Sequence, residues 1–122
     1  MRGVLAAILE SGQLERLYTG LSLLVSADES RALATFGALP LLLDPALEAH
    51  ALANPHVVAH EREAFARTLV ELREATAGRI WACAAAVQAT GADWAKVNER
   101  LAGVISTPQF LREIAGAQLV VV

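Results

Sequence analysis

The chain alternates short uncharged apolar runs with segments of helical periodicity, and this alternation constrains its fold more than any other feature. Val4–Leu9 and Ala117–Val122 are apolar runs of strand length. Between them, apolar residues recur at three- and four-residue steps, most regularly over Leu14–Ala27 and His60–Ala77. Alternating strands and helices are typical of a parallel sheet with helices on both faces. Continuous apolar strands agree with this, because parallel strands are buried on both faces.

Residues that start or end helices divide the remaining sequence. They predict three more strands, over Arg31–Phe36, Arg79–Ala82 and Gly103–Ile105. Further helices are expected over Ala38–Asp44, over Ala84–Thr90, after Asp93, and after a cap at Ser106 or Thr107. Ser11 is expected to cap the first helix, and Gly78 to end the helix that starts at His60. We therefore expect one domain over residues 1–122, a three-layer α/β/α fold with a mainly parallel sheet of about five strands.

Composition excludes several classes of protein. A chain with 55% apolar and 19% charged residues is not disordered, and one cysteine cannot form a disulfide within the chain. A net charge of -3 gives no electrostatic basis for binding nucleic acid or an anionic membrane. The longest uncharged runs are shorter than the roughly 18 residues of a membrane span. Glu10 interrupts the N-terminal apolar stretch too early for a signal peptide. We expect a cytoplasmic protein whose surplus apolar surface forms subunit contacts.

Ligands of open parallel sheets bind beyond the carboxyl ends of the strands, so the residues that follow each predicted strand are the candidate site. The pocket candidates are Ser11, Gly12, Phe36, Gly37, Ser106 and Thr107. Cys83 is the reactive group of this set. At the junction of a strand and a helix, amide N–H groups of the first turn lower a thiol pKa and favour the nucleophilic thiolate. The alternative is a buried, inert cysteine packed among alanines.

Four segments carry a resemblance to a known family. The segment IWACAAAVQATGAD resembles the region around the cysteine of the DsrE/DsrF-like proteins, with Trp81, Ala82, Cys83 and Gly91 at the matching positions. The other similar segments are Glu15–Ala27, Ala34–Leu43 and Ser106–Val122. The order of the segments and the placement of the cysteine carry the resemblance, which covers nearly the whole chain.

This resemblance implies a three-layer α/β fold and assembly into homo-oligomers, trimers or hexamers. It also implies a sulfur carrier or sulfurtransferase in which Cys83 is catalytic. Such a cysteine takes sulfane sulfur from a donor protein as a persulfide and passes it to an acceptor thiol, without a cofactor. The alternative from another class is a non-catalytic oligomeric or partner-binding module of the same fold.

The histidines offer a rival site. If Asn54 caps a helix, His56, His60 and Glu63 share one of its faces, where they could hold zinc or another transition metal. The more ordinary interpretation of these residues is a solvated helix face. Trp81 and Trp94 are expected to be core or interface anchors.

Overall fold

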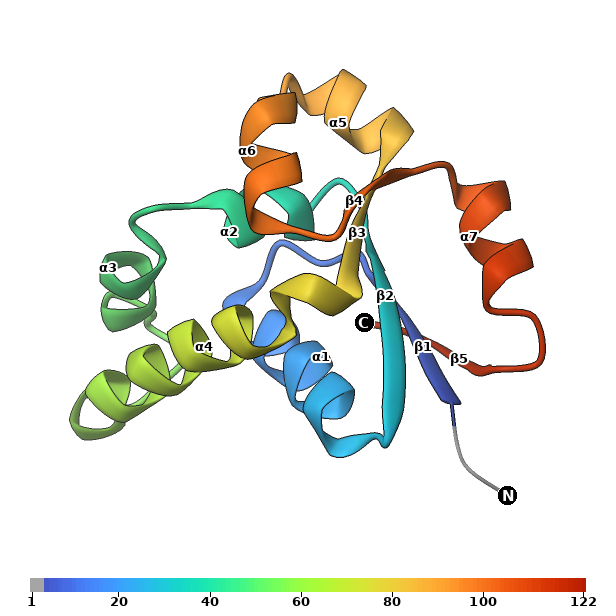
Figure 1. Ribbon diagram of the computed structural model, residues 1–122. Coiled ribbons are helices and arrows are strands. Elements are labelled where there is room, and N and C mark those ends of the chain that lie inside the picture. The colour runs from blue at the N-terminus through green and yellow to red at the C-terminus, as the bar shows by residue number, and fades with distance from the viewer. Residues whose placement is uncertain (1–3) are drawn as a thin grey trace.

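A sheet of five parallel strands forms the centre of the protein, in the order β4-β3-β2-β1-β5 (Figure 1). The computed structural model describes residues 4–122. The expected domain, 1–122, therefore includes residues 1–3, which lie outside the described residues. The strands are β1 (Val4–Leu9), β2 (Glu29–Ala34), β3 (Ile80–Cys83), β4 (Gly103–Ile105) and β5 (Gln118–Val121). The sequence prediction of a small α/β fold with about five strands is confirmed.

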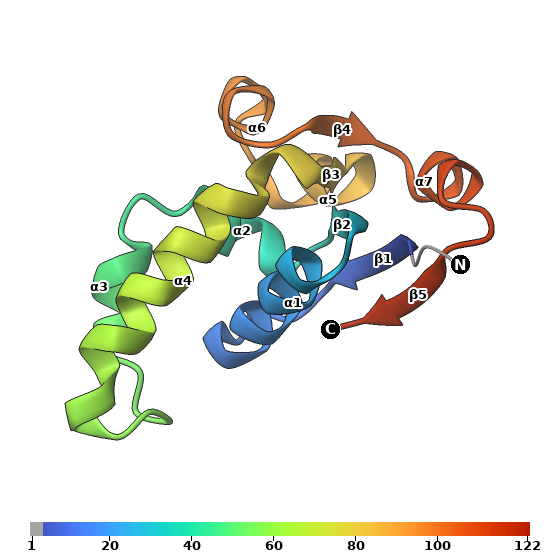
Figure 2. The same cartoon turned by 60° about the horizontal axis from the view of Figure 1, so that its bottom comes forward.

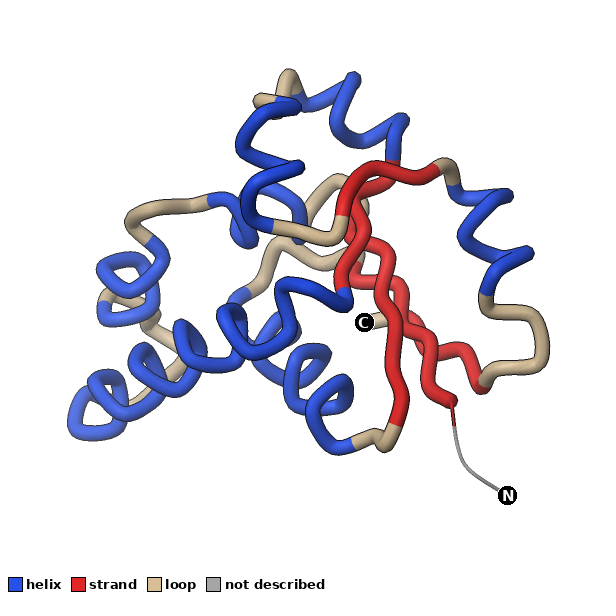
Figure 3. Tube along the Cα trace, viewed as in Figure 1, coloured by secondary structure: helices blue, strands red, loops and turns tan. Residues whose placement is uncertain are grey.

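Helices cover the sheet on both faces, which makes three layers. In Figure 1, α1 and α4 lie on one face and α7 lies on the other; Figure 3 shows the strands in red between them. The helices are α1 (Leu14–Ser26), α2 (Ala38–Leu43), α3 (Leu47–Leu52), α4 (Arg62–Thr76), α5 (Ala84–Thr90), α6 (Trp94–Arg100) and α7 (Thr107–Glu113). Two 3₁₀ turns, η1 (Ala59–Glu61) and η2 (Ala77–Arg79), flank α4. None of the helices within residues 4–122 combines the length and apolar character that crossing a membrane requires.

Small residues on the strands let the helices approach the sheet closely. The buried core contains Ala7, Ala32 and Ala82 on the strands together with leucines of α1 and α4. Gly20 lies in the middle of α1, where a Cβ atom would stand only 2.6 Å from Cδ2 of Leu9. The glycine inside this helix, which costs roughly 1 kcal/mol of helix propensity, therefore permits close packing on β1.

The helix expected from His60 begins at Arg62, and two residues expected at helix ends act differently. The first helix begins at Leu14 after Gln13, and Ser11 instead accepts a 3.1 Å bond from the Gln13 amide. Gly78 does not end α4 in a left-handed conformation, because the chain continues into η2. Both errors arise because a serine or a glycine indicates a turn but does not determine which type of turn forms.

Strand β2 begins two residues earlier than predicted, at Glu29 rather than Arg31. Ser30, one of the two added strand residues, is polar, and its hydroxyl is satisfied inside the fold. It donates to the Leu24 carbonyl at 2.8 Å and accepts from Nη1 of Arg79 at 3.0 Å. A polar residue thus occupies a buried strand position because α1 and η2 supply its partners.

The region between α2 and α4 is a partly helical connection that contains α3 and η1. Figure 2 shows α3 beside α4 at the end of the molecule away from the sheet. Arg73 of α4 fixes the end of α2, since its Nη1 donates to the carbonyls of Leu41 at 3.1 Å and Asp44 at 2.7 Å. These bonds satisfy carbonyls that a helix C-terminus leaves without partners.

Candidate functional site

Cys83 and Thr107 meet at the carboxyl edge of the sheet. Cys83 is the last residue of β3 and pairs in register with Ile105, the last residue of β4. Two residues beyond Ile105, Thr107 begins α7, and its Oγ1 lies 3.5 Å from Sγ of Cys83. The adjacency of β3 and β4 therefore brings a hydroxyl within hydrogen-bonding distance of the thiol.

The thiol belongs to the hydrophobic core. Cys83 is 4% exposed, and its neighbours along the chain, Ala82 and Ala86, are fully buried. Thr107, whose hydroxyl contacts the sulfur, is half-buried. Little of the sulfur is therefore open to a reactant from solvent in this conformation.

Ser106 fixes the start of α7. Its side chain accepts a 3.2 Å hydrogen bond from the Gln109 amide, and Pro108 occupies the first turn. This is the cap that the sequence predicts, and it places Thr107 as the first helical residue. Ser106 itself is exposed, so it positions Thr107 without contacting the thiol.

The remaining pocket candidates lie in the two loops that follow β1 and β2. The Gly12 and Gly37 backbones nearly touch, since a Cβ atom on Gly12 would lie 3.4 Å from the Gly37 carbonyl oxygen. Thr35 reinforces the contact by donating its amide to the Leu9 carbonyl at 2.9 Å. Phe36 is 52% exposed and points away from the core. Because β2 and β3 are parallel neighbours, these two loops and the Cys83–Thr107 pair lie at the same, carboxyl edge of the sheet.

The helix needed for the metal site does not form. Instead of capping a helix, Asn54 is buried and donates a 2.6 Å bond to Oε1 of Glu15. His56 lies 3.1 Å from Oε2 of Glu15, and Nε2 of His60 lies 3.9 Å from Glu61. His50 contacts Oδ2 of Asp44 at 2.6 Å.

Each histidine therefore contacts a carboxylate away from Cys83. No group of three metal-ligating side chains occurs within residues 4–122. The structure thus assembles no zinc ligand set from His56, His60 and Glu63 in this region.

The Glu15 network predicts a pH-dependent contribution to stability. Hydrogen bonds from Asn54 and His56 hold the pKa of Glu15 below its usual value. A carboxylate with a lowered pKa stabilises the fold above its unfolded pKa, and this contribution is lost as pH falls through the folded pKa. Glu15→Gln should lower the free energy of unfolding at pH 7 by about 1 kcal/mol or less, since the Glu15 side chain is 38% exposed.

Urea denaturation of wild type and Glu15→Gln from pH 7 to pH 3 measures this contribution. The difference should be constant at neutral pH and shrink below the unfolded pKa of about 4.3. Exposed Glu71, mutated to Gln, provides the control and should show no such pH dependence. A difference that grows on acidification would contradict the assignment.

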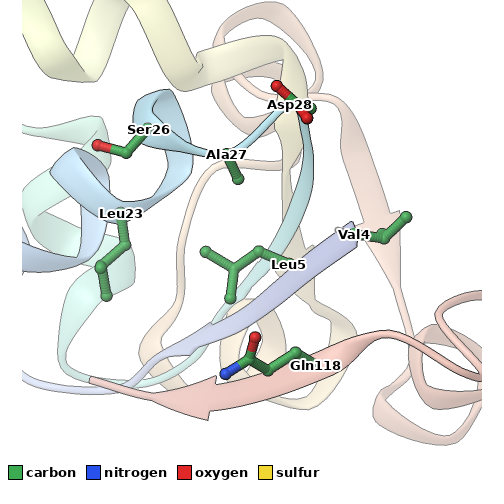
Figure 4. Close-up of a pocket in the computed structure, with 7 residues that line it drawn as sticks. All are labelled: Val4, Leu5, Leu23, Ser26, Ala27, Asp28 and Gln118. Carbon is green, nitrogen blue, oxygen red and sulfur yellow. The ribbon is translucent and has the colours of Figure 1, made fainter. Parts of the chain in front are cut away.

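A pocket of about 350 Å³ lies at the opposite, amino-terminal edge of the sheet (Figure 4). Leu5 of β1 and Leu23 of α1 point into it, and Gln118 closes one side. Its lining residues are Val4, Leu5, Leu23, Ser26, Ala27, Asp28 and Gln118. Sequence reasoning missed this pocket because it examined only the carboxyl ends of the strands, and no motif marks the lining residues.

Trp81 and Trp94 differ in their surroundings. Trp81 lies on β3, packs against the core, and leaves no space for a side chain at Gly103, whose Cβ would stand 2.9 Å from the Trp81 ring. Trp94 is 51% exposed, so it is not part of the core of the single chain. The interpretation of Trp81 as a core anchor is confirmed, whereas Trp94 remains a candidate only for an interface.

Compared with known proteins, the chain matches no family model and no curated protein.

Proposed function

We propose that this protein is a cytoplasmic sulfur carrier or sulfurtransferase that holds sulfane sulfur on Cys83 as a persulfide. The contact between Sγ of Cys83 and Oγ1 of Thr107, 3.5 Å apart at the carboxyl edge of the sheet, is the observation that carries the proposal. A hydroxyl at this distance can donate to a thiolate and stabilise it. The resemblance of the sequence around Cys83 to DsrE/DsrF-like proteins supports the same chemistry.

The proposed reaction is two successive transfers of one sulfur atom. The Cys83 thiolate attacks the outer sulfur of a donor persulfide, R–S–SH. A new S–S bond forms, the donor S–S bond breaks, and the donor leaves as the thiolate R–S⁻. An acceptor thiolate then attacks the outer sulfur of Cys83–S–SH, takes it away and regenerates the Cys83 thiolate. The sequence has one cysteine, which suffices because neither step needs a resolving thiol within the chain.

Mass spectrometry after incubation with a persulfide donor tests the proposal. Wild type should gain about 32 Da, one sulfur atom, and lose it on addition of an acceptor thiol. Cys83→Ser should gain nothing. Thr107→Val preserves the shape of Thr107 but removes the hydroxyl, so it should slow loading about tenfold if the lost bond to a charged sulfur is worth roughly 1.5 kcal/mol.

The matched control is Thr90→Val, because the Thr90 hydroxyl bonds to the Ala86 carbonyl at 2.6 Å and not to the thiol. This variant should load at the wild-type rate. Equal loading of wild type and Thr107→Val would remove Thr107 from the mechanism. Absence of the added sulfur in wild type would overturn the proposal.

A second candidate function is a non-catalytic oligomeric or partner-binding module. The 4% exposure of Cys83 favours it, as do Leu119 and Val121, which are 44% and 60% exposed on β5. Thiol labelling at neutral pH separates the two functions. Labelling of the native protein supports chemistry at Cys83, whereas labelling only after denaturation supports the module.

A further inference from the structure

Strand β5 has one free edge. It pairs with β1 on one side, and no strand within residues 4–122 pairs with its other side. The Val122 amide donates to the Ile8 carbonyl at 2.8 Å, and the Val122 carbonyl accepts from the Glu10 amide at 2.8 Å. Since successive residues of a strand direct their peptide groups to opposite sides, the N–H and C=O groups of Leu119 and Val121 point away from β1.

This free edge lacks two of the features that normally prevent strands from pairing between molecules, charged side chains and proline. Natural edge strands are protected by lysine, proline or bulges. The segment Ala117–Val122 contains neither a charged residue nor a proline. Leu119 and Val121, whose peptide groups are free, are also 44% and 60% exposed. The occupant of this edge must therefore supply an extended backbone and apolar side chains.

We propose that a second copy of this chain occupies the edge, with the two β5 strands antiparallel about a two-fold axis at Val120. In this register Leu119 of each copy lies opposite Val121 of the other. The outward N–H and C=O groups of both residues then form four hydrogen bonds between the copies. A two-fold contact brings together the β5 strands of the two copies, so the same sequence supplies the hydrogen-bonding groups on each side of the contact. The two sheets become one sheet of ten strands.

The absence of charged side chains on the strand favours a second copy. Identical strands without charged side chains meet without like-charge repulsion. Val122 of each copy lies opposite Gln118 of the other, on the face of the sheet that carries α1. Gln118 borders the pocket of about 350 Å³ that contains Leu5 and Leu23 (Figure 4). Val122 itself packs on its own α1, since its Cγ1 lies 3.5 Å from the Cβ position of Gly20, so the contact leaves this pocket open beside it.

The mass of the full chain in solution tests the contact. Light scattering at about 100 μM should give twice the 12.9 kDa of one chain, or an even-numbered assembly such as a hexamer. Leu119→Lys should break the contact, halving a dimer or converting a hexamer to trimers. Leu111→Lys is the matched control, since Leu111 on α7 is also 44% exposed, and it should leave the mass unchanged.

Val121→Pro gives a second, more selective test. The Val121 amide points away from β1, so proline removes no hydrogen bond from the single chain but removes one donor from each copy at the proposed contact. We expect the variant to remain folded, by circular dichroism, and to dissociate. A monomeric or trimeric wild type would overturn the proposal, as would an assembly that both Leu119→Lys and Val121→Pro leave intact.

Cross-linking tests the register. In a Cys83→Ser background, Val120→Cys should form an intermolecular disulfide under mild oxidation. The two Val120 Cα atoms face each other as a non-hydrogen-bonded pair, about 4.5 Å apart, within the range a disulfide spans. Leu119→Cys should not cross-link, because its two copies stand diagonally, about 7–8 Å apart. The reverse result would overturn the register.

Sulfur loading of the Val121→Pro variant is measured separately, so failure of the contact and failure of sulfur chemistry are distinguishable.

Discussion

Replacing Phe110 with alanine is expected to lower the free energy of unfolding by about 3–5 kcal/mol. Phe110 is 1% exposed and is the buried side chain of α7. Helix α7 covers the face of the sheet opposite α1 and α4 (Figure 1). Truncation of the ring leaves a cavity beneath a seven-residue helix that packing, rather than its own propensity, holds in place. Urea denaturation followed by circular dichroism measures the loss.

The adjacent residue provides the control for Phe110. Leu111 is 44% exposed on the same helix, and Leu111→Ala should change the free energy of unfolding by no more than about 0.5 kcal/mol. The two variants should also differ at the site. Because Thr107 begins α7 and lies 3.5 Å from Cys83, loosening the helix should speed labelling of the Cys83 thiol in Phe110→Ala. Equal stability losses, or unchanged labelling, would show that α7 is not fixed by Phe110.

Much of the fold follows from local signals in the sequence. The short strand Gly103–Ile105 and the helix Ala84–Thr90 have the predicted bounds, and Gly91 ends that helix in a left-handed conformation with φ 69°. Asp93 caps α6 by accepting from the Ala95 amide at 2.9 Å. Such features depend on residues within one turn of each other, so the sequence identifies them directly.

Two of the errors involve partners that are distant in sequence. Asn54 is a plausible helix cap until Glu15, 39 positions away, binds its side-chain amide. Strand β2 begins before its predicted start and includes Ser30, whose hydroxyl is satisfied by Arg79 and Leu24. Local propensity contains no information about these contacts, and tertiary structure overrides it.

The candidate site was partly predictable. The rule for parallel sheets placed Cys83 and Thr107 at the same edge. Their direct contact depends on β3 and β4 being neighbours, which the sequence does not fix. The pocket beside Gln118 was not predictable, since it arises where α1 ends above β1 and β5.

The second large effect is expected at Gly37, where alanine should lower the free energy of unfolding by about 3 kcal/mol. A Cβ atom there would stand 2.6 Å from the Gly12 nitrogen and still closer to the Glu10 carbonyl oxygen. Both atoms belong to the backbone, so no side-chain rotation relieves the overlap. The backbone of Gly37 has φ -77° and ψ -35°, which alanine adopts readily. The whole penalty therefore comes from forcing apart the loops that follow β1 and β2.

Gly78→Ala is the matched control, because no atom of the described chain lies within 4 Å of its Cβ position and its φ is not positive. This substitution should be neutral or should stabilise the protein by up to about 1 kcal/mol, since alanine restricts the unfolded chain. Thermal denaturation of the two variants compares them directly. If both glycines tolerated alanine equally, the β1 and β2 loops would not be in tight contact at the carboxyl edge. A selective loss at Gly37 would instead show that close packing of these loops, next to the Cys83–Thr107 pair, is required for the stability of the fold.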